Sequence, residues 1–118
     1  MNDGKPEDIR ERTFRFSVSV ISVCKSLERN EANRVLINQV LRSATSIGAN
    51  LEEAQGAHTR PEFTNCTNIA KKEARETFYW LRLLAETNPA NKNLGMLILE
   101  AEEITKILTA SVKKLKGA

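Results

Sequence analysis

Residues 42 to 57 read RSATSIGANLEEAQGA, and small side chains fill this stretch although the apolar positions around it keep a helical period. The residues that set this period, by steps of four and three, are Ile37, Leu41, Ala44, Gly48 and Leu51. They predict a helix from about 31 to 58, with Asn30 as its N-cap. A glycine inside a helix costs about 1 kcal/mol relative to alanine. We therefore expect a neighbouring helix to approach Gly48 closely, at Phe78 or Phe63.

A second row on the same helix is polar and mostly short. It consists of Gln39, Ser43, Ser46, Asn50 and Glu53, each two positions out of phase with the first row. Two residues turn a helix by about 200°, so this row should lie opposite the core. Short polar side chains let another backbone come close, and we expect the row to contact a neighbouring subunit. The motif that we assign to close packing or oligomerisation comprises Arg42, Ser43, Ser46, Gly48, Asn50, Glu53 and Glu76.

Arg42 is a long cation at the start of this motif. In an antiparallel hairpin that turns near His58, it lies level with about residue 75 of the following helix. Glu73 and Glu76 are therefore its expected ion-pair partners, either within the bundle or across a subunit boundary. A contact with RNA is the alternative role for Arg42.

Three further segments carry a helical period and complete the fold prediction. They span about 7 to 29, 60 to 88 and 93 to 116. The first contains RFSVSVISV, which alternates like a strand, yet its apolar residues also fit a helical stripe. The second begins with a capping box between Thr59 and Glu62 and ends before Pro89. The chain is therefore predicted to be all-α, with one domain over residues 1–118 that folds as an antiparallel up-down-up-down four-helix bundle.

The composition is that of an ordinary globular protein, with 118 residues of which 41% are hydrophobic and 28% charged. Five glycines and three prolines are too few for many short strands, which favours helices. No apolar run approaches the roughly 20 residues that a membrane span needs, and the polar N-terminus is no secretory signal. We expect a cytoplasmic protein with no membrane partner, in which Cys24 and Cys66 are free thiols.

The sequence offers no set of residues suited to catalysis. His58 is the only histidine, so the Glu-x-x-His pairs of a di-iron bundle cannot be built, and we expect His58 to lie on the surface. A nucleophile made of Cys66 and His58 would have no third group to orient it. No glycine-rich phosphate loop is present. We therefore predict no enzyme activity and assign no catalytic residue, cofactor or metal.

Three of the four helices carry more apolar residues than one core stripe needs. The additional residues are Phe14, Val18 and Ile21 in the first helix, Trp80 and Leu83 in the third, and Met96, Leu99 and Ile107 in the fourth. Self-association would cover these residues, and a thick core with a few exposed apolar side chains is the alternative. Tyr79 and Trp80 lie in the middle of the third helix, where we expect them to pack and not to stack on bases.

Three stretches resemble the 23S rRNA-intervening-sequence family of four-helix-bundle proteins. They are RSATSIGANLEEAQGA at 42–57, RPEF at 60–63 and IAKKEARETFYWLRLL at 69–84. The resemblance extends from about Phe16 to Lys116. It implies a left-handed up-down bundle that assembles into a ring-like homopentamer, and it implies neither an enzymatic activity nor a cofactor.

The family is also similar to the accessory protein of diversity-generating retroelements. That protein is a basic pentamer that binds nucleic acid and a reverse transcriptase. The similarity implies RNA or DNA as a partner of this chain, and with it a nucleic-acid enzyme such as a reverse transcriptase.

The cations that we expect to contact nucleic acid come from the start of the first helix, the start of the third and the end of the fourth. They are Arg10, Arg12, Arg15, Arg60, Lys113, Lys114 and Lys116. We expect all seven at one end of the bundle, together with six carboxylates. These are Glu7, Asp8, Glu11, Glu52, Glu53 and Glu62. One chain has a net charge of only +3, so repetition around a ring would add weak phosphate contacts together.

Two functions are compatible with these observations. One is a non-enzymatic oligomer, a pentamer by resemblance, that binds RNA or a nucleoprotein partner through phosphates without sequence preference. The other is a protein-interaction scaffold that has no nucleic-acid role. Nucleic acid that co-purifies with the protein and is released by salt would favour the first function.

Overall fold

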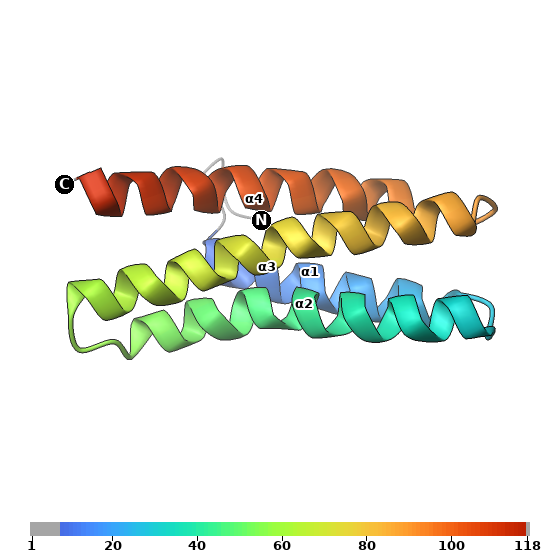
Figure 1. Cartoon of the computed structure of the whole chain (residues 1–118), viewed down its shortest axis with the longest axis horizontal. Coiled ribbons are helices and arrows are strands. Elements are labelled where there is room, and N and C mark those ends of the chain that lie inside the picture. The colour runs from blue at the N-terminus through green and yellow to red at the C-terminus, as the bar shows by residue number, and fades with distance from the viewer. Residues whose placement is uncertain (1–7, 118) are drawn as a thin grey trace.

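The computed structural model describes residues 8–117, and four α-helices make up nearly all of this range. They are α1 (Ile9–Ser26), α2 (Glu31–Gln55), α3 (Arg60–Thr87) and α4 (Leu94–Gly117). Successive helices run in opposite directions and are joined by short turns (Figure 1). The predicted all-α, up-down-up-down four-helix bundle is therefore confirmed. The expected start of the first helix at residue 7 lies outside the described residues.

Side-chain caps fix where three of the helices begin. The Asp8 carboxylate accepts a hydrogen bond from the Arg10 backbone N–H at 2.8 Å, which starts α1. The Asn30 side chain accepts from the Asn33 N–H at 2.8 Å, as expected for the N-cap of α2. At α3, the Thr59 hydroxyl accepts from the Glu62 N–H at 3.2 Å. Each cap satisfies a donor that would otherwise have no partner inside its helix.

The four helices differ in length, and this difference shapes the molecule. Helix α1 has 18 residues, or about 27 Å, whereas α3 has 28 residues, or about 42 Å. Helix α1 ends at Ser26 and not near residue 29 as expected, because the backbone of Leu27 is extended with a ψ of 150°. At its other end α1 begins well inside the end of the bundle that holds the α2–α3 turn (Figure 1). Three helices, and not four, therefore form that end within the described residues.

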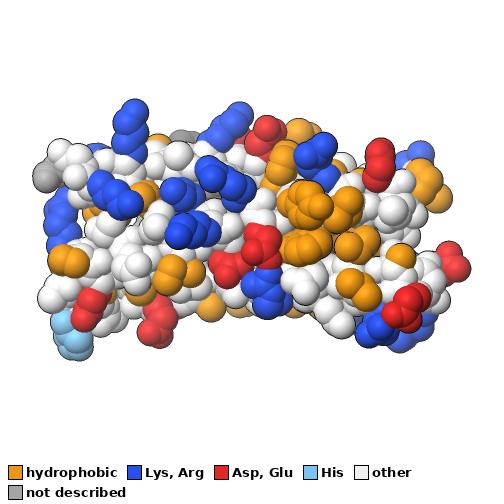
Figure 2. Space-filling view, in the orientation of Figure 1, with side chains coloured by type: hydrophobic (Ala, Val, Ile, Leu, Met, Phe, Trp, Pro, Cys, Tyr) orange, Lys and Arg blue, Asp and Glu red, His pale blue; other side chains and the backbone are white. Residues whose placement is uncertain are grey.

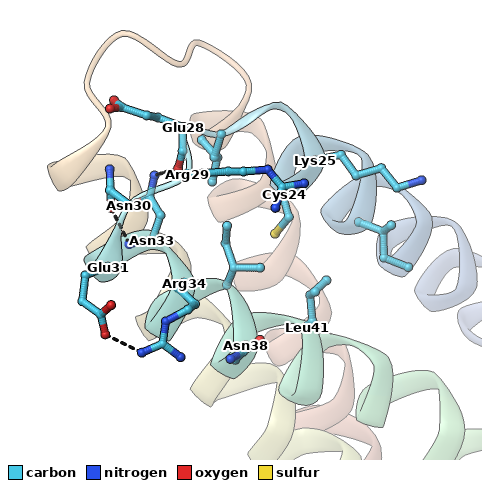
Figure 3. Close-up of a pocket in the computed structure, with 13 residues that line it drawn as sticks. Cys24, Lys25, Glu28, Arg29, Asn30, Glu31, Asn33, Arg34, Asn38 and Leu41 are labelled. Carbon is cyan, nitrogen blue, oxygen red and sulfur yellow. Dashed lines mark hydrogen bonds and ion pairs between the residues drawn. The ribbon is translucent and has the colours of Figure 1, made fainter.

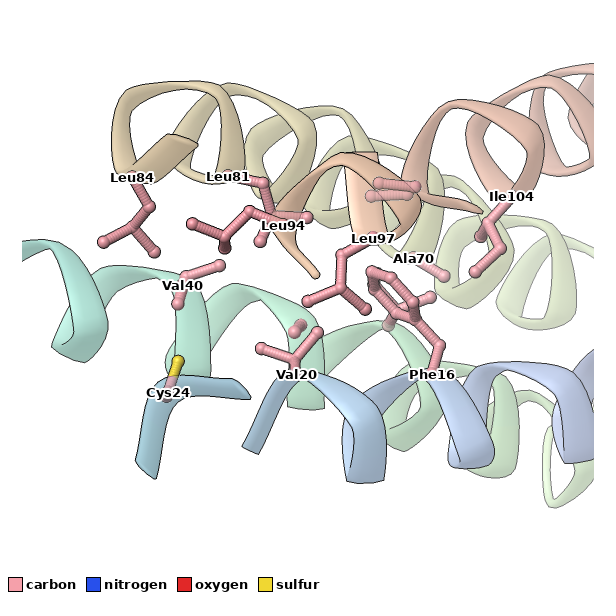
Figure 4. Packing of buried hydrophobic residues seen from close by; sticks show 14 of the residues in the cluster. Phe16, Val20, Cys24, Val40, Ala70, Leu81, Leu84, Leu94, Leu97 and Ile104 are labelled. Carbon is pink, nitrogen blue, oxygen red and sulfur yellow. The ribbon is translucent and has the colours of Figure 1, made fainter. Parts of the chain in front are cut away.

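The core contains apolar side chains from all four helices. Figure 4 shows Phe16 and Val20 of α1 pointing toward Leu97 and Ile104 of α4, with α2 and α3 closing the sides. The side chains with no exposed surface include Val20, Val40, Ala44, Ile47, Ala70, Ala74, Leu81, Leu84, Ala101 and Ile104. Alanines from α2, α3 and α4 occur among these, so the helices can approach closely at these positions.

The orientation of α2 differs from the prediction by about one helical position. Its most buried row contains Val40, Ser43 and Ile47, while Ile37 and Gly48 of the expected row are only half-buried. The reason is that the helices packed on the two sides of α2 differ in length. Helix α3 packs along α2 where Val40, Ser43 and Ile47 are fully buried, whereas the short α1 covers the Ile37 side in part. Ser43 was therefore wrongly placed opposite the core.

Candidate nucleic-acid interface

Arg12 is engaged within the fold and lies away from the ends of the bundle. Its Nε and one terminal nitrogen donate to the two carboxylate oxygens of Glu100 at 2.6 and 2.9 Å. These hydrogen bonds raise the pKa of Arg12 above its ordinary value. Glu100 precedes Lys113 by 13 residues on α4, which is about 20 Å along the helix. Arg12 therefore does not join the lysines at the end of α4.

Arg10 and Arg15 lie on the same short helix as Arg12, α1. The Arg10 guanidinium lies 3.4 Å from the carboxylate of Asp8, and its backbone N–H holds the pKa of Asp8 below the ordinary value. Arg15 is exposed one turn further along α1. The prediction that these three arginines share one end with the other cations is wrong. The reason is that α1 begins far from that end (Figure 1).

Arg60 and the end of α4 do lie together. A terminal nitrogen of Arg60 donates to the backbone carbonyl of Leu115 at 3.2 Å. Lys113, Lys114 and Lys116 surround this contact on the exposed surface of the last turns of α4. A shallow groove of about 390 Å³ separates the two helices here, and Asn68 contributes to its lining. The Oδ1 atom of Asn68 is buried and accepts no hydrogen bond from a described residue.

Additional cations extend this cluster along α3 and α4. Figure 2 shows Lys and Arg side chains gathered over both helices on the half of the molecule that holds the end of α4. We call this surface the basic face and define it as Arg60, Lys71, Lys72, Arg75, Lys106, Lys113, Lys114 and Lys116. Apart from the Arg60 bond, none of the eight has an ion pair or side-chain hydrogen bond with another residue in the described range.

The charge of the basic face exceeds that of the whole chain. The segments 60–75 and 104–117 contain these eight cations and only two carboxylates, Glu62 and Glu73. Their balance is +6, against +3 for all 118 residues. Lys71, Lys72, Arg75 and Lys106 were not among the predicted cations, because the prediction rested on helix ends alone. The KKEAR run at 71–75 and the absence of carboxylates from 104–117 are the signals that could have revealed them.

Arg42 forms the ion pairs that the sequence predicts, and it forms them within one chain. Its guanidinium lies 3.2 Å from a carboxylate oxygen of Glu73 and also contacts Glu76. Glu76 in turn accepts a hydrogen bond from the Trp80 indole N–H at 3.0 Å. The cluster joins α2 to α3, so Arg42 is engaged in holding these helices together.

The small residues of α2 face two different neighbours. The Ser43 hydroxyl accepts a hydrogen bond from Thr77 of α3 at 2.8 Å, and both side chains are fully buried. A Cβ atom added at Gly48 would lie 3.5 Å from the Thr13 hydroxyl oxygen of α1. The predicted neighbours of Gly48, Phe63 and Phe78 of α3, were therefore wrong. The phase error in α2 explains this, because Gly48 faces α1 and not α3.

The other members of the predicted motif lie further from the core. Ser46 and Asn50 are half-buried, and the Asn50 side-chain amide donates to the Ser46 carbonyl at 2.8 Å. Glu53 is exposed. Within residues 8–117, none of these three side chains forms a hydrogen bond with another helix. Their role in an oligomer stays a prediction.

Several large apolar side chains lie on the surface. Phe14, Val18 and Ile21 of α1 and Met96 and Leu99 of α4 are exposed, as the extra rows predicted. Trp80, Leu83 and Ile107 are half-buried.

Tyr79 differs from the expectation that it packs inside the bundle. It is exposed, and its ring meets the ring of Trp80 edge-on, with 5.2 Å between the centroids. The phase of α3 explains this difference, because Thr77 and Leu81 take the buried positions on either side of Tyr79.

A pocket of about 520 Å³ lies at the opposite end, between the end of α1 and the start of α2 (Figure 3). Cys24 and Leu41 contribute apolar surface to it, and Lys25, Arg29 and Arg34 carry its positive charges. Burial raises the pKa of Cys24 to about 11, so the thiol stays protonated and unreactive at neutral pH. Cys24 and Cys66 are both free, as predicted.

Asn33 lines this pocket and belongs to a polar clamp that was not predicted from the sequence. Its side-chain nitrogen donates to the Asn88 oxygen at 3.0 Å, and the Asn88 nitrogen donates back at 2.9 Å. The same Asn33 nitrogen donates to the Glu28 carbonyl at 2.7 Å, and Asn88 also donates to the Leu84 carbonyl at 2.9 Å. The clamp therefore joins both turns at this end of the bundle.

Two further features bear on the class of protein. Residues 8–117 contain no group of three or more His, Cys, Asp or Glu side chains that could hold a metal ion. No helix in that range combines the length and the apolar character that crossing a bilayer requires.

His58 lies on the surface, as predicted. It is exposed beside the α2–α3 turn, and its backbone N–H donates to Glu62 at 2.7 Å.

The chain is similar to a protein of unknown function from the S23 ribosomal protein family of Bacteroides thetaiotaomicron, whose crystal structure is known. The two share 37% sequence identity with a TM-score of 0.80, over 90% of this chain and 99% of that one. No curated protein matches. The family profile of the 23S rRNA-intervening sequence protein matches residues 6–110. The chain therefore belongs to the 23S rRNA-intervening sequence protein family.

Proposed function

We propose that the chain forms a homo-oligomer that binds RNA through phosphate groups, using the basic face of α3 and α4. The single observation that carries this proposal is the concentration of charge on that face. Eight cations with a local balance of +6 lie on two neighbouring helices of a chain whose total is +3. Cations that are free of protein partners can contact phosphates without first breaking an ion pair.

The family supports RNA as the ligand. Both the matching family and the similar crystal structure carry names that refer to ribosomal components, 23S rRNA in one case and an S23 ribosomal protein in the other. Neither name states what this chain binds. The charge of the basic face favours a polyanion, and the family names point to ribosomal RNA, which is a polyanion.

The surface chemistry favours binding without sequence preference. The basic face contains lysines and arginines, and the Asn side chains of α3 beside them are Asn65 and Asn68, both in the groove next to Arg60. Reading base edges requires such bidentate donors and acceptors at defined positions in a groove. Tyr79 is the exposed aromatic nearest to Arg75 on α3, and one ring is too few for a stacking platform.

Oligomerisation would raise the affinity of the basic face for RNA. One copy offers a modest field, whereas linked copies bind with an effective concentration that multiplies weak contacts. Five copies, the number that the family resemblance implies, would carry a total charge of five times +3, or +15. The exposed apolar side chains of α1 and α4 support self-association, because exposed apolar side chains that form a patch are typical of surfaces that bind another protein.

Salt-dependent binding tests the proposal. Fluorescence anisotropy with a labelled RNA hairpin, measured between about 50 and 200 mM salt, should give a log–log slope that steepens by about 0.7 to 0.9 for each phosphate neutralised. The variant Lys113→Gln, Lys114→Gln, Lys116→Gln should flatten that slope by the same amount for each lysine that contacts a phosphate. Its oligomeric mass should not change, because all three lysines are exposed at the end of α4.

A matched control removes the same charge elsewhere. Lys25→Gln, Arg29→Gln, Lys92→Gln changes three exposed cations near the opposite end of the bundle and should leave the slope unaltered. Equal flattening in both triple variants would refute the assignment to the basic face. Absence of binding at low salt would refute the RNA proposal and favour the protein-interaction scaffold, for which the exposed apolar residues are the supporting observation.

A further inference from the structure

The pocket between the end of α1 and the start of α2 has the dimensions of a small-molecule site (Figure 3). We call it the α1–α2 pocket. Its volume of about 520 Å³ lies within the range of roughly 300–1,000 Å³ that is usual for ligand sites. Residues 27–30, which join the two helices, form its wall together with residues of both helices. A compact ligand in this pocket would therefore contact three segments of the chain at once.

Apolar side chains line the inner wall of the α1–α2 pocket. Cys24 and Leu27 are each 8% exposed and belong to the edge of the bundle core. Ile37 and Leu41 of α2 are half-buried, and Ile21 of α1 is exposed. We call these five residues the apolar wall. It favours a ligand with an aliphatic chain, because each methylene group moved from water onto such a surface raises affinity by up to about fourfold.

Five charged side chains also line the pocket, and two of them are cations without a carboxylate partner in residues 8–117. Arg34 pairs with Glu31 one turn earlier in α2, so these two charges compensate each other. Figure 3 shows the Glu28 carboxylate pointing away from Lys25 and Arg29. Within the described range, neither Lys25 nor Arg29 forms an ion pair or a side-chain hydrogen bond. Both cations are therefore available to an anionic group in the pocket.

Arg29 belongs to the turn between the helices and reaches over the pocket. Figure 3 shows its side chain extending toward Cys24 of α1. Lys25 follows Cys24 in the sequence, and its flexible side chain is exposed. A guanidinium presents parallel N–H donors whose spacing matches the two oxygens of a carboxylate, and a lysine adds charge without a fixed geometry. A carboxylate placed beside Cys24 would therefore meet cations from both the turn and α1.

The apolar wall and the two cations together select the class of ligand. An uncharged apolar compound would leave both cations unused, and a small inorganic anion would leave the apolar wall in contact with water. RNA has no aliphatic chain to bury against that wall. A compound that combines an aliphatic chain with one carboxylate uses both parts of the pocket.

We propose that the α1–α2 pocket binds a small amphipathic carboxylate, with its aliphatic chain against the apolar wall and its carboxylate at Arg29 and Lys25. The carboxylate accepts hydrogen bonds from the Arg29 guanidinium, and Lys25 contributes the second positive charge. No residue of the basic face lines this pocket, which lies at the opposite end of the bundle from the last turns of α4. The inference is therefore independent of RNA binding.

A series of fatty acids tests the site. Hexanoate, octanoate and decanoate are titrated into the isotope-labelled full chain, and nuclear magnetic resonance follows the backbone amide signals. Each pair of added methylene groups should lower Kd by up to about fifteenfold until the pocket is filled. The amide shifts should concentrate in residues 21–41, which contain the pocket, and leave residues 104–117 unchanged.

Octanamide, which has the chain of octanoate without its charge, tests the role of the cations. The wild-type protein should bind octanoate about two- to fivefold more tightly than octanamide, the range for an ion pair at an exposed site. Arg29→Gln should remove most of this preference and leave the octanamide affinity unaltered. The matched control is Lys92→Gln, which removes an exposed cation near the same end of the bundle that does not line the pocket, and the preference should persist there.

A polar substitution tests the apolar wall separately. Ile21→Asn should weaken the binding of octanoate and octanamide alike, because it removes apolar surface that both chains contact. Ile21 is exposed, so the core and the fold should be kept.

Three results would overturn the proposed site. Decanoate could shift no amide signal in residues 21–41, which would leave the pocket without this ligand. Octanoate and octanamide could bind the wild-type protein equally, which would leave the carboxylate without a role. The preference for octanoate could fall equally in Arg29→Gln and Lys92→Gln, which would show an effect of total charge and not of the pocket.

Discussion

Gly48 of α2 faces Thr13 of α1 across an ordinary van der Waals gap, and this gap determines which residues the position tolerates. An added Cβ would lie 3.5 Å from the Thr13 hydroxyl oxygen and 4.0 Å from the Phe14 backbone nitrogen, so a methyl group fits without displacement. Gly48→Ala should therefore raise the free energy of unfolding by up to about 1 kcal/mol through helix propensity. Gly48→Leu should lower it by about 1–3 kcal/mol, because a larger side chain overpacks the α1–α2 contact.

Urea denaturation of both variants measures these changes. The control is Ala49→Gly at the next, exposed position of the same helix, which should lose about 1 kcal/mol and so calibrates the propensity term. A loss of stability in Gly48→Ala as well would show that α1 approaches more closely than these distances allow.

Residue-level prediction succeeded for Arg42 and failed for Ser43, which is its neighbour in the sequence. The partners of Arg42 follow from register alone, because a short turn between two antiparallel helices fixes which residues lie level. Ser43 was placed on the surface because apolar periodicity treats every hydroxyl as polar. Its hydroxyl is satisfied inside the core by Thr77, and the sequence does not show that one buried hydroxyl has a matching partner on another helix.

At the scale of elements, the clamp between Asn33 and Asn88 fastens the end of the bundle where α1 meets α2 and α3 meets α4. Each amide donates to the other, and Asn33 is almost fully buried. Asn33→Ala leaves the Asn88 side chain and the Glu28 carbonyl without the partner that the buried Asn33 provides, which costs about 1–3 kcal/mol of unfolding free energy. The double variant Asn33→Ala, Asn88→Ala should cost less than the two single variants together, because both lose the same pair of bonds.

A double-mutant cycle by urea denaturation measures this coupling. Asn38→Ala is the control, since Asn38 is an exposed residue of the same helix and its replacement should change stability by no more than about 0.5 kcal/mol. Simple additivity of the two single variants would contradict the clamp.

The four helices were predictable, but their relative axial positions were not. Apolar period, the Thr59 cap and the break at Pro89 are local signals, and each appears directly in the sequence. The place where α1 begins beside its neighbours depends on packing among all four helices. That placement separates Arg10, Arg12 and Arg15 from the lysines of α4. Of the expected cation cluster, only Arg60 and these lysines therefore lie together.

At the scale of the whole molecule, charge and apolar surface are segregated. The basic face occupies α3 and α4 near the end of α4, while the exposed apolar side chains Phe14, Val18, Met96 and Leu99 lie on α1 and at the start of α4. Net charge alone conceals this separation, because carboxylates elsewhere reduce the total to +3. RNA binding by weak repeated contacts requires more than one copy of the chain. Self-association is therefore the claim on which the account depends most.

Multi-angle light scattering at micromolar concentration measures self-association directly. We predict the mass of an oligomer that persists on dilution within this range. With the five copies that the family resemblance implies, the mass is five times 13.2 kDa, or about 66 kDa. A mass that stays at 13.2 kDa at every concentration would contradict the account.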